Sequence, residues 1–228
     1  MKNNQFWQMK QSGDTLELYI YSTVESDSWW KESETSAAHF RDMLAEHSDA
    51  KEIKVYINSL GGSVMEGIAI YNQLKRHSAH KTVIVDGFAC SIASVIAMAG
   101  DTVIMPKNTV MMIHNAWTIA MGNSAELRKA ADDLDVINQA SRQAYLDKSA
   151  GKLTEEKLTE LLDAETYLTA EQCIELGLAD RFSADDSRDD TGSTAKEQAA
   201  QQSAEQMAAA EMEKRKAKAL AAINRYFG

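Results

Sequence analysis

Three short segments carry the residue types that nucleophilic catalysis requires. A serine, Ser91, follows Cys90 in the apolar segment "VDGFACSIASVIAMAG", and two adjacent glycines, Gly61 and Gly62, end the segment "EIKVYINSLGG". A histidine, His114, ends the hydrophobic run "TVMMIH". A serine hydroxyl becomes a nucleophile when a histidine accepts its proton, and free backbone N–H groups can stabilise the charge that develops on a carbonyl oxygen. Together the three segments fit acyl-transfer chemistry.

Each segment also has a purely structural interpretation. Ser91 can be a small packing residue in an alanine-rich helix, and the glycine pair can simply allow a tight turn from a strand to a helix. A single histidine such as His114 is more often structural than catalytic. If a helix begins at Ser91, however, the N–H of Ile92 points the same way as the serine hydroxyl and can act as an oxyanion donor. His114 alone among the five histidines ends a predicted strand, where it can act as a general base.

A serine and histidine pair also needs an acid that orients the imidazole ring. Asp163 and Glu165 precede a capped helix in "LLDAETYLTAEQ", in the position of a surface loop. Ordinary helix-terminus charge is the structural alternative for both. Phosphate binding fits the glycine pair poorly, because its spacing differs from that of a P-loop and no lysine follows it.

The elements that would position these residues alternate between strand and helix. Runs rich in β-branched and aromatic residues predict strands at 15–24, 52–58, 81–87, 101–106 and 109–114. Helical spacing of apolar residues and capping signals predict helices at 34–47, 65–77, 91–99, 124–150, 154–162 and 169–176. Thr35 or Ser36 can cap the first helix, and Thr169 and Gln172 can form a capping box at the last. The helix at 124–150 is amphipathic, with Leu127 and Ile137 on its apolar face. This alternation with tight glycine turns predicts an α/β fold with a mainly parallel sheet covered by helices.

Composition limits the class of protein. The chain has 228 residues and a formal net charge of −10, which argues against a nucleic-acid partner. Cys90 and Cys173 lack a C-x-x-C partner, and we interpret them as reduced thiols of a cytosolic protein. The first ten residues are not a signal peptide, and the apolar stretch at 88–100 is too short to span a membrane. We expect no metal site and no cofactor.

The composition changes near Ser183. Residues 184–206 lack large apolar side chains and predict an acidic, polar, flexible linker after a domain at 1–183. Residues 207–228 are alanine-rich with Leu220, Ile223 and Phe227 on one face, which predicts an amphipathic helix. This helix either seeks a partner or is simply exposed.

Four separated segments together resemble the Clp protease proteolytic subunit family, and more closely its phage and prophage head maturation proteases. They are "YINSLGGSVMEGIAIYNQL", "VDGFACSIASVIAMAG", "VIMPKNTVMMIHNAW" and "ETYLTAEQCIELGLAD", within the range 15–182. The resemblance implies a ClpP/crotonase-like fold and an ATP-independent serine endopeptidase without cofactor. It implies Ser91 as nucleophile, His114 as base, and the N–H groups of Gly62 and Ile92 as the oxyanion hole.

The sequence departs from the family pattern at three of these positions. The family aspartate falls on Glu165, with Asp163 as a rival, and the proline of the glycine turn is Leu60. Cys90 replaces a small alanine, and we do not expect it to compete as a nucleophile. The resemblance further implies that an extended substrate pairs with the strand at Ser63, Val64 and Met65.

The resemblance also implies partners. Family members assemble into face-to-face rings, with the helix predicted at 124–150 as the inter-ring handle. The tail at 184–228 suggests a tether to scaffold or capsid protein, in the cytoplasm of a bacterial host or inside an assembling procapsid. A housekeeping ClpP-type peptidase that works with an ATP-driven unfoldase is an alternative. A crotonase-like acyl-CoA enzyme and an inactive structural ring are alternatives of another class.

Overall fold

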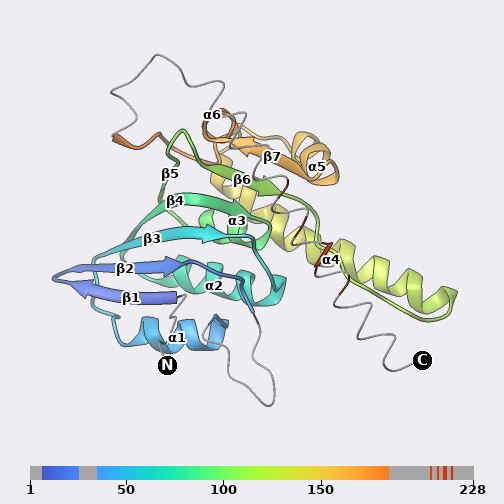
Figure 1. Cartoon of the computed structure of the whole chain (residues 1–228), viewed down its shortest axis with the longest axis horizontal. Helices are drawn as coiled ribbons and strands as arrows, with labels where there is room; N and C mark the ends of the chain where they lie inside the picture. The colour runs from blue at the N-terminus through green and yellow to red at the C-terminus, as the bar shows by residue number, and fades with distance from the viewer. Residues whose placement is uncertain are drawn as a thin grey trace.

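One mixed sheet organises the chain (Figure 1). The computed structural model describes residues 7–25 and 35–184, together with the isolated positions 206, 210, 213, 214 and 217. The elements of the described chain are β1 (Trp7–Ser12), β2 (Thr15–Ile20), α1 (Ala37–Ala45), β3 (Glu52–Ser59), α2 (Val64–Arg76), β4 (His80–Cys90), α3 (Ile92–Ala97), β5 (Thr102–Ile104), β6 (Val110–Ile113), α4 (Ser124–Ser149), α5 (Glu155–Asp163), β7 (Thr166–Thr169) and α6 (Ala170–Glu175). The seven strands follow the order β1-β2-β3-β4-β6-β7, and β5 pairs with β4 beside this path.

The centre of the sheet is parallel and its two edges are antiparallel. Strands β2, β3 and β4 pair in parallel, and β4 pairs in parallel with β5 through its first half and with β6 through its last residues. β1 and β7 add antiparallel edges to β2 and β6. The predicted α/β class and mainly parallel sheet are therefore confirmed. The sequence analysis did not predict β1 or β7, because a strand as short as β7 shows no clear periodicity of its own.

Alternate residues of the central strands are buried, because one face of the sheet packs against the helices. Leu16, Leu18 and Ile20 of β2 are buried, whereas the residues between them are only partly buried. The inner side chains join residues of α1, α2 and α3 in one hydrophobic core. Within it, a Cβ atom on Gly67 of α2 would lie 2.0 Å from Cγ1 of Ile92. Glycine therefore lets α2 approach the first residue of α3 closely.

Local signals account for where the helices begin. Ser36 caps α1 by accepting a hydrogen bond from the N–H of His39, as predicted for Thr35 or Ser36. A capping box joins Thr169 and Gln172 at the start of α6, also as predicted. The helix predicted at 91–99 is shorter in the structure, where it begins one residue later.

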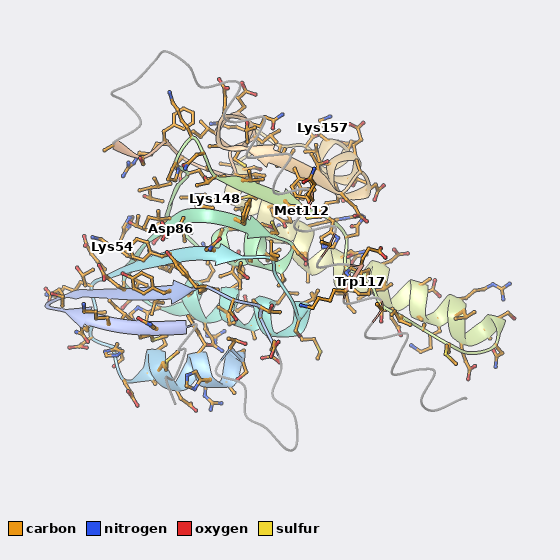
Figure 2. All side chains as sticks on the ribbon, in the orientation of Figure 1. Lys54, Asp86, Met112, Trp117, Lys148 and Lys157 are labelled. Atoms are coloured by element: carbon orange, nitrogen blue, oxygen red, sulfur yellow. The ribbon has the colours of Figure 1, made fainter. Side chains whose placement is uncertain are left out.

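The two halves of α4 have different surroundings. The half toward the C-terminus packs into the body of the protein, where Ala144 and Tyr145 are 3% and 1% exposed. The other half extends beyond the sheet, with Trp117 lying beside the base of the extension (Figures 1 and 2). Its side chains Leu127, Val136 and Ile137 are exposed. Leu127 and Ile137, which were predicted on the apolar face of this helix, are therefore exposed, because this part of α4 projects past the elements that could cover it.

The predicted linker (184–206) and terminal helix (207–228) lie almost wholly outside the described residues. The isolated positions in this range are helical and exposed, and the two assignments stay predictions. Among the helices that the structure describes, none combines the length and apolarity of a membrane span.

Candidate active site

Ser91 stands at the junction between β4 and α3 in an unusual backbone conformation. Its φ is 55° and its ψ is −130°, and it occupies the N-cap of α3 without using its side chain as a cap. A non-glycine residue at positive φ costs on the order of 1 kcal/mol and persists only where its surroundings hold it. The N–H of Ser91 donates to the carbonyl of Met112 at 2.8 Å, and its own carbonyl accepts from the N–H of Ser94 at 2.9 Å. The hydroxyl is left available for another partner.

That partner is His114. Its Nε2 atom lies 2.7 Å from Ser91 Oγ. The contact arises because β6 pairs in parallel with the end of β4, with Cys90 opposite Met112, so that the carboxyl ends of both strands meet at one edge. Met112 is labelled on β6 in Figure 2. This distance is that of a hydroxyl hydrogen-bonded to the base that can accept its proton.

The glycine pair is clamped between two backbones. The N–H of Val24 donates to the carbonyl of Gly61 at 3.0 Å, and the N–H of Ser63 donates to the carbonyl of Val24 at 2.8 Å. A Cβ atom on Gly61 would lie 2.7 Å from Ser91 Cβ, and one on Gly62 would lie 2.0 Å from the carbonyl oxygen of Val24. Both glycines also have positive φ values, 86° and 153°. Only glycine fits at these two positions.

Two backbone donors remain unused beside Ser91. The N–H of Ile92 belongs to the first turn of α3, where N–H groups have no partner within the helix. Within residues 7–25 and 35–184, neither this group nor the N–H of Gly62 donates a hydrogen bond. A Cβ atom on Gly61 would lie 3.2 Å from the nitrogen of Ile92, so the loop adjoins the helix start. The two predicted oxyanion donors, the N–H groups of Gly62 and Ile92, therefore belong to two segments that meet at Gly61.

The two candidate acids differ in their relation to His114. Strand β7 pairs with β6 so that Thr166 is opposite Ile113, and one further step of this register would set Glu165 opposite His114. Glu165 is exposed and leaves the strand conformation with a φ of 50°. Asp163 instead accepts a hydrogen bond from Asn115 Nδ2 at 2.7 Å. Neither carboxylate hydrogen-bonds to His114 in the described part of the chain.

At Val64 and Met65 the structure has a helix where the resemblance implied a strand for the substrate. Ser63 caps α2 by accepting from the N–H of Glu66, and Val64 and Met65 are the first residues of that helix. A helical residue directs its N–H and C=O along the helix axis and cannot form a strand ladder with a peptide. The capping serine thus turns the chain into a helix before an extended edge can form.

The thiol of Cys90, the residue before Ser91, is a poor nucleophile. Burial raises the pKa of its thiol to about 12, against the opposing effect of a hydrogen bond from the backbone of Met112. The thiolate is the nucleophilic form of cysteine, so a thiol with this pKa does not compete with Ser91 at neutral pH. The described residues also contain no group of three or more side chains suited to hold a metal ion.

Comparison with known proteins identifies the family of the chain. A family model described as Clp protease matches residues 30–186. The ATP-dependent Clp protease proteolytic subunit of Ligilactobacillus salivarius is 35% identical over 133 residues, which cover 57% of this chain and 66% of the relative. The protein of the same description from Deinococcus radiodurans is 29% identical over 153 residues, which cover 66% of this chain and 73% of the relative.

The chain belongs to the Clp protease family. The resemblance seen in the sequence is confirmed at this level, and the fold is the mixed α/β fold of a ClpP-like protein. In this Clp protease family member, the segments that carry the resemblance supply the end of β4, the end of β6, the glycine loop and the start of β7.

Sequence reasoning missed three residues that support the site. Val24 clamps the glycine loop, Ser94 contacts the carbonyl of Ser91, and Tyr145 contacts Ser94. Only Ser94 carried a local signal, because it lies one helical turn after Ser91. Val24 and Tyr145 contact the site through tertiary structure, which no local sequence pattern predicts.

Proposed function

We propose that the chain is a serine endopeptidase in which Ser91 is the nucleophile and His114 the general base. The observation that carries the proposal is the 2.7 Å contact between Ser91 Oγ and His114 Nε2. Its support is the pair of N–H groups on Gly62 and Ile92, which donate no hydrogen bond within the described residues. A nucleophile, a base and preorganised donors are the three parts that acyl transfer needs.

The steps follow from these positions. Ser91 Oγ attacks the carbonyl carbon of a peptide bond while its proton passes to Nε2 of His114. The oxygen of the tetrahedral intermediate takes up the negative charge and binds the N–H groups of Gly62 and Ile92. The C–N bond then breaks, and His114 gives its proton to the leaving amine. Water hydrolyses the acyl-enzyme by the same route in reverse, so these steps call for no metal or nucleotide.

Glu165 is the acid that the geometry favours. The β6–β7 register sets Thr166 opposite Ile113, so one further step along both chains leads to Glu165 and His114, and rotation of the exposed Glu165 side chain could bring its carboxylate to the imidazole. Asp163 is the alternative, although it is already engaged by Asn115. The acid would hold the tautomer in which Nε2 accepts the serine proton.

Reaction with a fluorophosphonate probe tests the proposal directly. We expect the wild-type chain to be labelled, and both Ser91→Ala and His114→Ala to lose the label, because triad serines and histidines contribute on the order of a million-fold in rate. Cys90→Ala is the matched control at the neighbouring position and should keep the label. An unlabelled wild-type protein, assayed in its assembled form, would favour the inactive structural ring. Binding of an acyl-CoA thioester would favour the crotonase-type alternative.

We further propose that the chain self-associates through the projecting half of α4. Leu127 and Val136 of α4 are exposed, at 44% and 65%, as are Trp117 and Met121 in the segment that leads into this helix, at 40% and 56%. Apolar side chains gathered on one projection are typical of an association surface. Sedimentation of the wild type against Val136→Glu tests this idea: dissociation of the variant supports it, and an unchanged sedimentation coefficient contradicts it.

The biological role that we propose is processing of phage capsid or scaffold protein, in a host cytoplasm or an assembling procapsid. The polar segment and predicted helix at 184–228 support it as a tether. Both relatives named above are described as ATP-dependent, so cooperation with an unfoldase is the competing proposal. Deletion of 184–228 should leave peptidase activity intact and abolish co-assembly with capsid proteins. Degradation of a folded substrate only when an ATP-driven unfoldase is added would favour the competing role.

A further inference from the structure

A buried chain of hydroxyl groups ends on the backbone of the candidate nucleophile. Tyr145 in α4 and Ser94 in α3 are 1% and 0% exposed. Ser94 Oγ lies 2.6 Å from the hydroxyl of Tyr145 and 2.5 Å from the carbonyl oxygen of Ser91. The two hydroxyls come from helices that are far apart in the sequence, and none of the steps above uses them.

The direction of the protons in this chain is fixed by its end point. A carbonyl oxygen only accepts, so the single hydroxyl hydrogen of Ser94 points to Ser91 O. Tyr145 must then donate its own hydrogen to Ser94 Oγ. Burial raises the pKa of Tyr145 above its ordinary value, so the phenol keeps that hydrogen at neutral pH. Hydroxyls that donate in series polarise one another, and the polarisation here is delivered to the Ser91 carbonyl.

That carbonyl shares a peptide unit with a predicted oxyanion donor. The C=O of Ser91 and the N–H of Ile92 belong to one planar group, in which the two bonds point in opposite directions. Two donors from Ser94 hold the oxygen, its N–H at 2.9 Å and its Oγ at 2.5 Å. Fixing the oxygen therefore fixes the direction of the Ile92 N–H. Withdrawal of electron density by the two donors also makes this N–H a stronger donor.

We propose that Ser94 and Tyr145 are positioning residues that orient and polarise the Ser91–Ile92 peptide group for oxyanion binding. The inference rests on the proposed serine endopeptidase function and adds two residues to it. Packing alone does not account for the tyrosine, because a phenylalanine ring would fill the same space without burying a hydroxyl. The strained φ of Ser91 makes such support necessary, since an unsupported peptide group would relax.

Tyr145→Phe is the main test, because it removes the hydroxyl and keeps the ring. Kinetics with a chromogenic peptide amide should show kcat lowered about tenfold with KM unchanged, a smaller effect than loss of a whole oxyanion donor. Affinity for a peptide boronate, whose adduct places an oxygen in the oxyanion hole, should fall by a similar factor. Ser149→Ala is the matched control on the same helix, since Ser149 is 1% exposed and its hydroxyl donates to the carbonyl of Leu146, within its own helix. It should leave kcat and the boronate affinity unchanged.

A double-mutant cycle separates positioning from packing. Ser94→Ala should lower kcat about as much as Tyr145→Phe, and the double variant should be little worse than Ser94→Ala, because the two hydroxyls act in series. An unchanged kcat in both single variants overturns the inference. So does a loss of kcat that only parallels a loss in melting temperature. If Tyr145→Phe does not fold, Ser94→Ala alone tests the inference, which again requires a lowered kcat with an unchanged KM. An unlabelled wild type contradicts the proposed function, whereas a labelled wild type with unaltered variants contradicts only this inference.

Discussion

The two ends of strand β4 differ in whether their polar groups have hydrogen-bond partners. At its beginning, Lys81 is 6% exposed and its ammonium donates to the carbonyls of His77 and Ala79 and contacts Asp101. At its end, the Ser91 hydroxyl and His114 are only half-buried. Two N–H groups beside them have no acceptor within the described residues. The first end is saturated and the second is open.

At the beginning of β4, the saturated end, the network of ion pairs and hydrogen bonds includes residues of neighbouring chain segments. Asp101 accepts from the N–H of Lys81 and donates its own N–H to the Lys81 carbonyl. Lys148 of α4 donates to Asp180 at 2.7 Å, and Asp180 accepts from the N–H of Val103. These four charged side chains all have partners inside the protein, so the cluster is structural. A site that must bind a reacting group needs the opposite, namely donors and acceptors held in place without partners.

The open end lies where an α/β sheet commonly places its ligands. The carboxyl ends of β3, β4 and β6 converge there, and each is followed by one part of the site: the glycine loop, Ser91 and His114. Ligands of open α/β sheets bind outside these ends, because the strands stop and leave loops and helix starts exposed. Substitutions at the open end should therefore change rate, and substitutions at the saturated end should change stability.

After the losses expected for Ser91→Ala and His114→Ala, the largest effect is expected from Glu165, the proposed acid. Glu165→Gln keeps the size of the side chain and removes its charge, so kcat should fall on the order of ten-thousandfold, as for the acid of other triads. Peptide hydrolysis measured at saturating substrate would report this. Asp163→Asn is the matched control and should cost far less, because it mainly weakens the contact with Asn115. A larger loss in Asp163→Asn than in Glu165→Gln would make Asp163 the acid and contradict the register argument.

The next effect concerns the glycine loop. Gly62→Ala places a Cβ atom 2.0 Å from the carbonyl oxygen of Val24 and must displace the loop. Loss of its N–H from the oxyanion hole should lower kcat about a hundredfold. Gly13→Ala is the control, because Gly13 also has a positive φ of 59° but its Cβ would meet nothing within 4 Å. That variant should lose some stability through backbone strain and keep its kcat; equal losses of kcat in the two variants would contradict the role of the loop.

Local chemistry explains which of these features the sequence could predict. Capping at Ser36 and Thr169 and the strand-helix alternation depend on neighbours in the chain, and both were predicted. Strand β7, the clamp by Val24 and the contact of Tyr145 with Ser94 depend on partners far away, and they were not. The strand implied at 63–65 is absent for a local reason: Ser63 is the N-cap of α2, so that Val64 and Met65 are helical.

The beginning of β4 should respond in stability alone. Lys81→Met keeps the length of the side chain but removes the ammonium group that donates to the carbonyls of His77 and Ala79 and contacts Asp101. The free energy of unfolding in urea should fall by about 2 kcal/mol, the cost of unsatisfied buried groups. Lys129→Met breaks an exposed pair with Asp133 and should cost less than about 0.5 kcal/mol. A drop in kcat for the folded Lys81→Met protein would show that the two ends of β4 are coupled.

The smallest effect is a dependence of stability on pH at the same end. Burial would raise the pKa of the Asp101 carboxyl, but hydrogen bonds from Lys81 and its charge together lower it below the ordinary value of 3.8. The folded protein therefore binds this proton less tightly than the unfolded chain, and the ionised carboxylate stabilises the fold fully above pH 3.8. As the pH falls below that value, the unfolded chain takes up the proton first and the contribution is lost.

Comparison of the wild type with Asp101→Asn isolates this contribution. The difference between their urea midpoints should be present at about pH 5 and shrink at about pH 3. Asp101 is 37% exposed, so solvent screens its charge and the total should stay below about 1 kcal/mol. A difference that stays constant with pH would mean that hydrogen-bond geometry rather than charge stabilises this end. The pH dependence of kcat should be unaltered in Asp101→Asn, because the proton transfer that we propose, between Ser91 and His114, takes place at the other end of the strand.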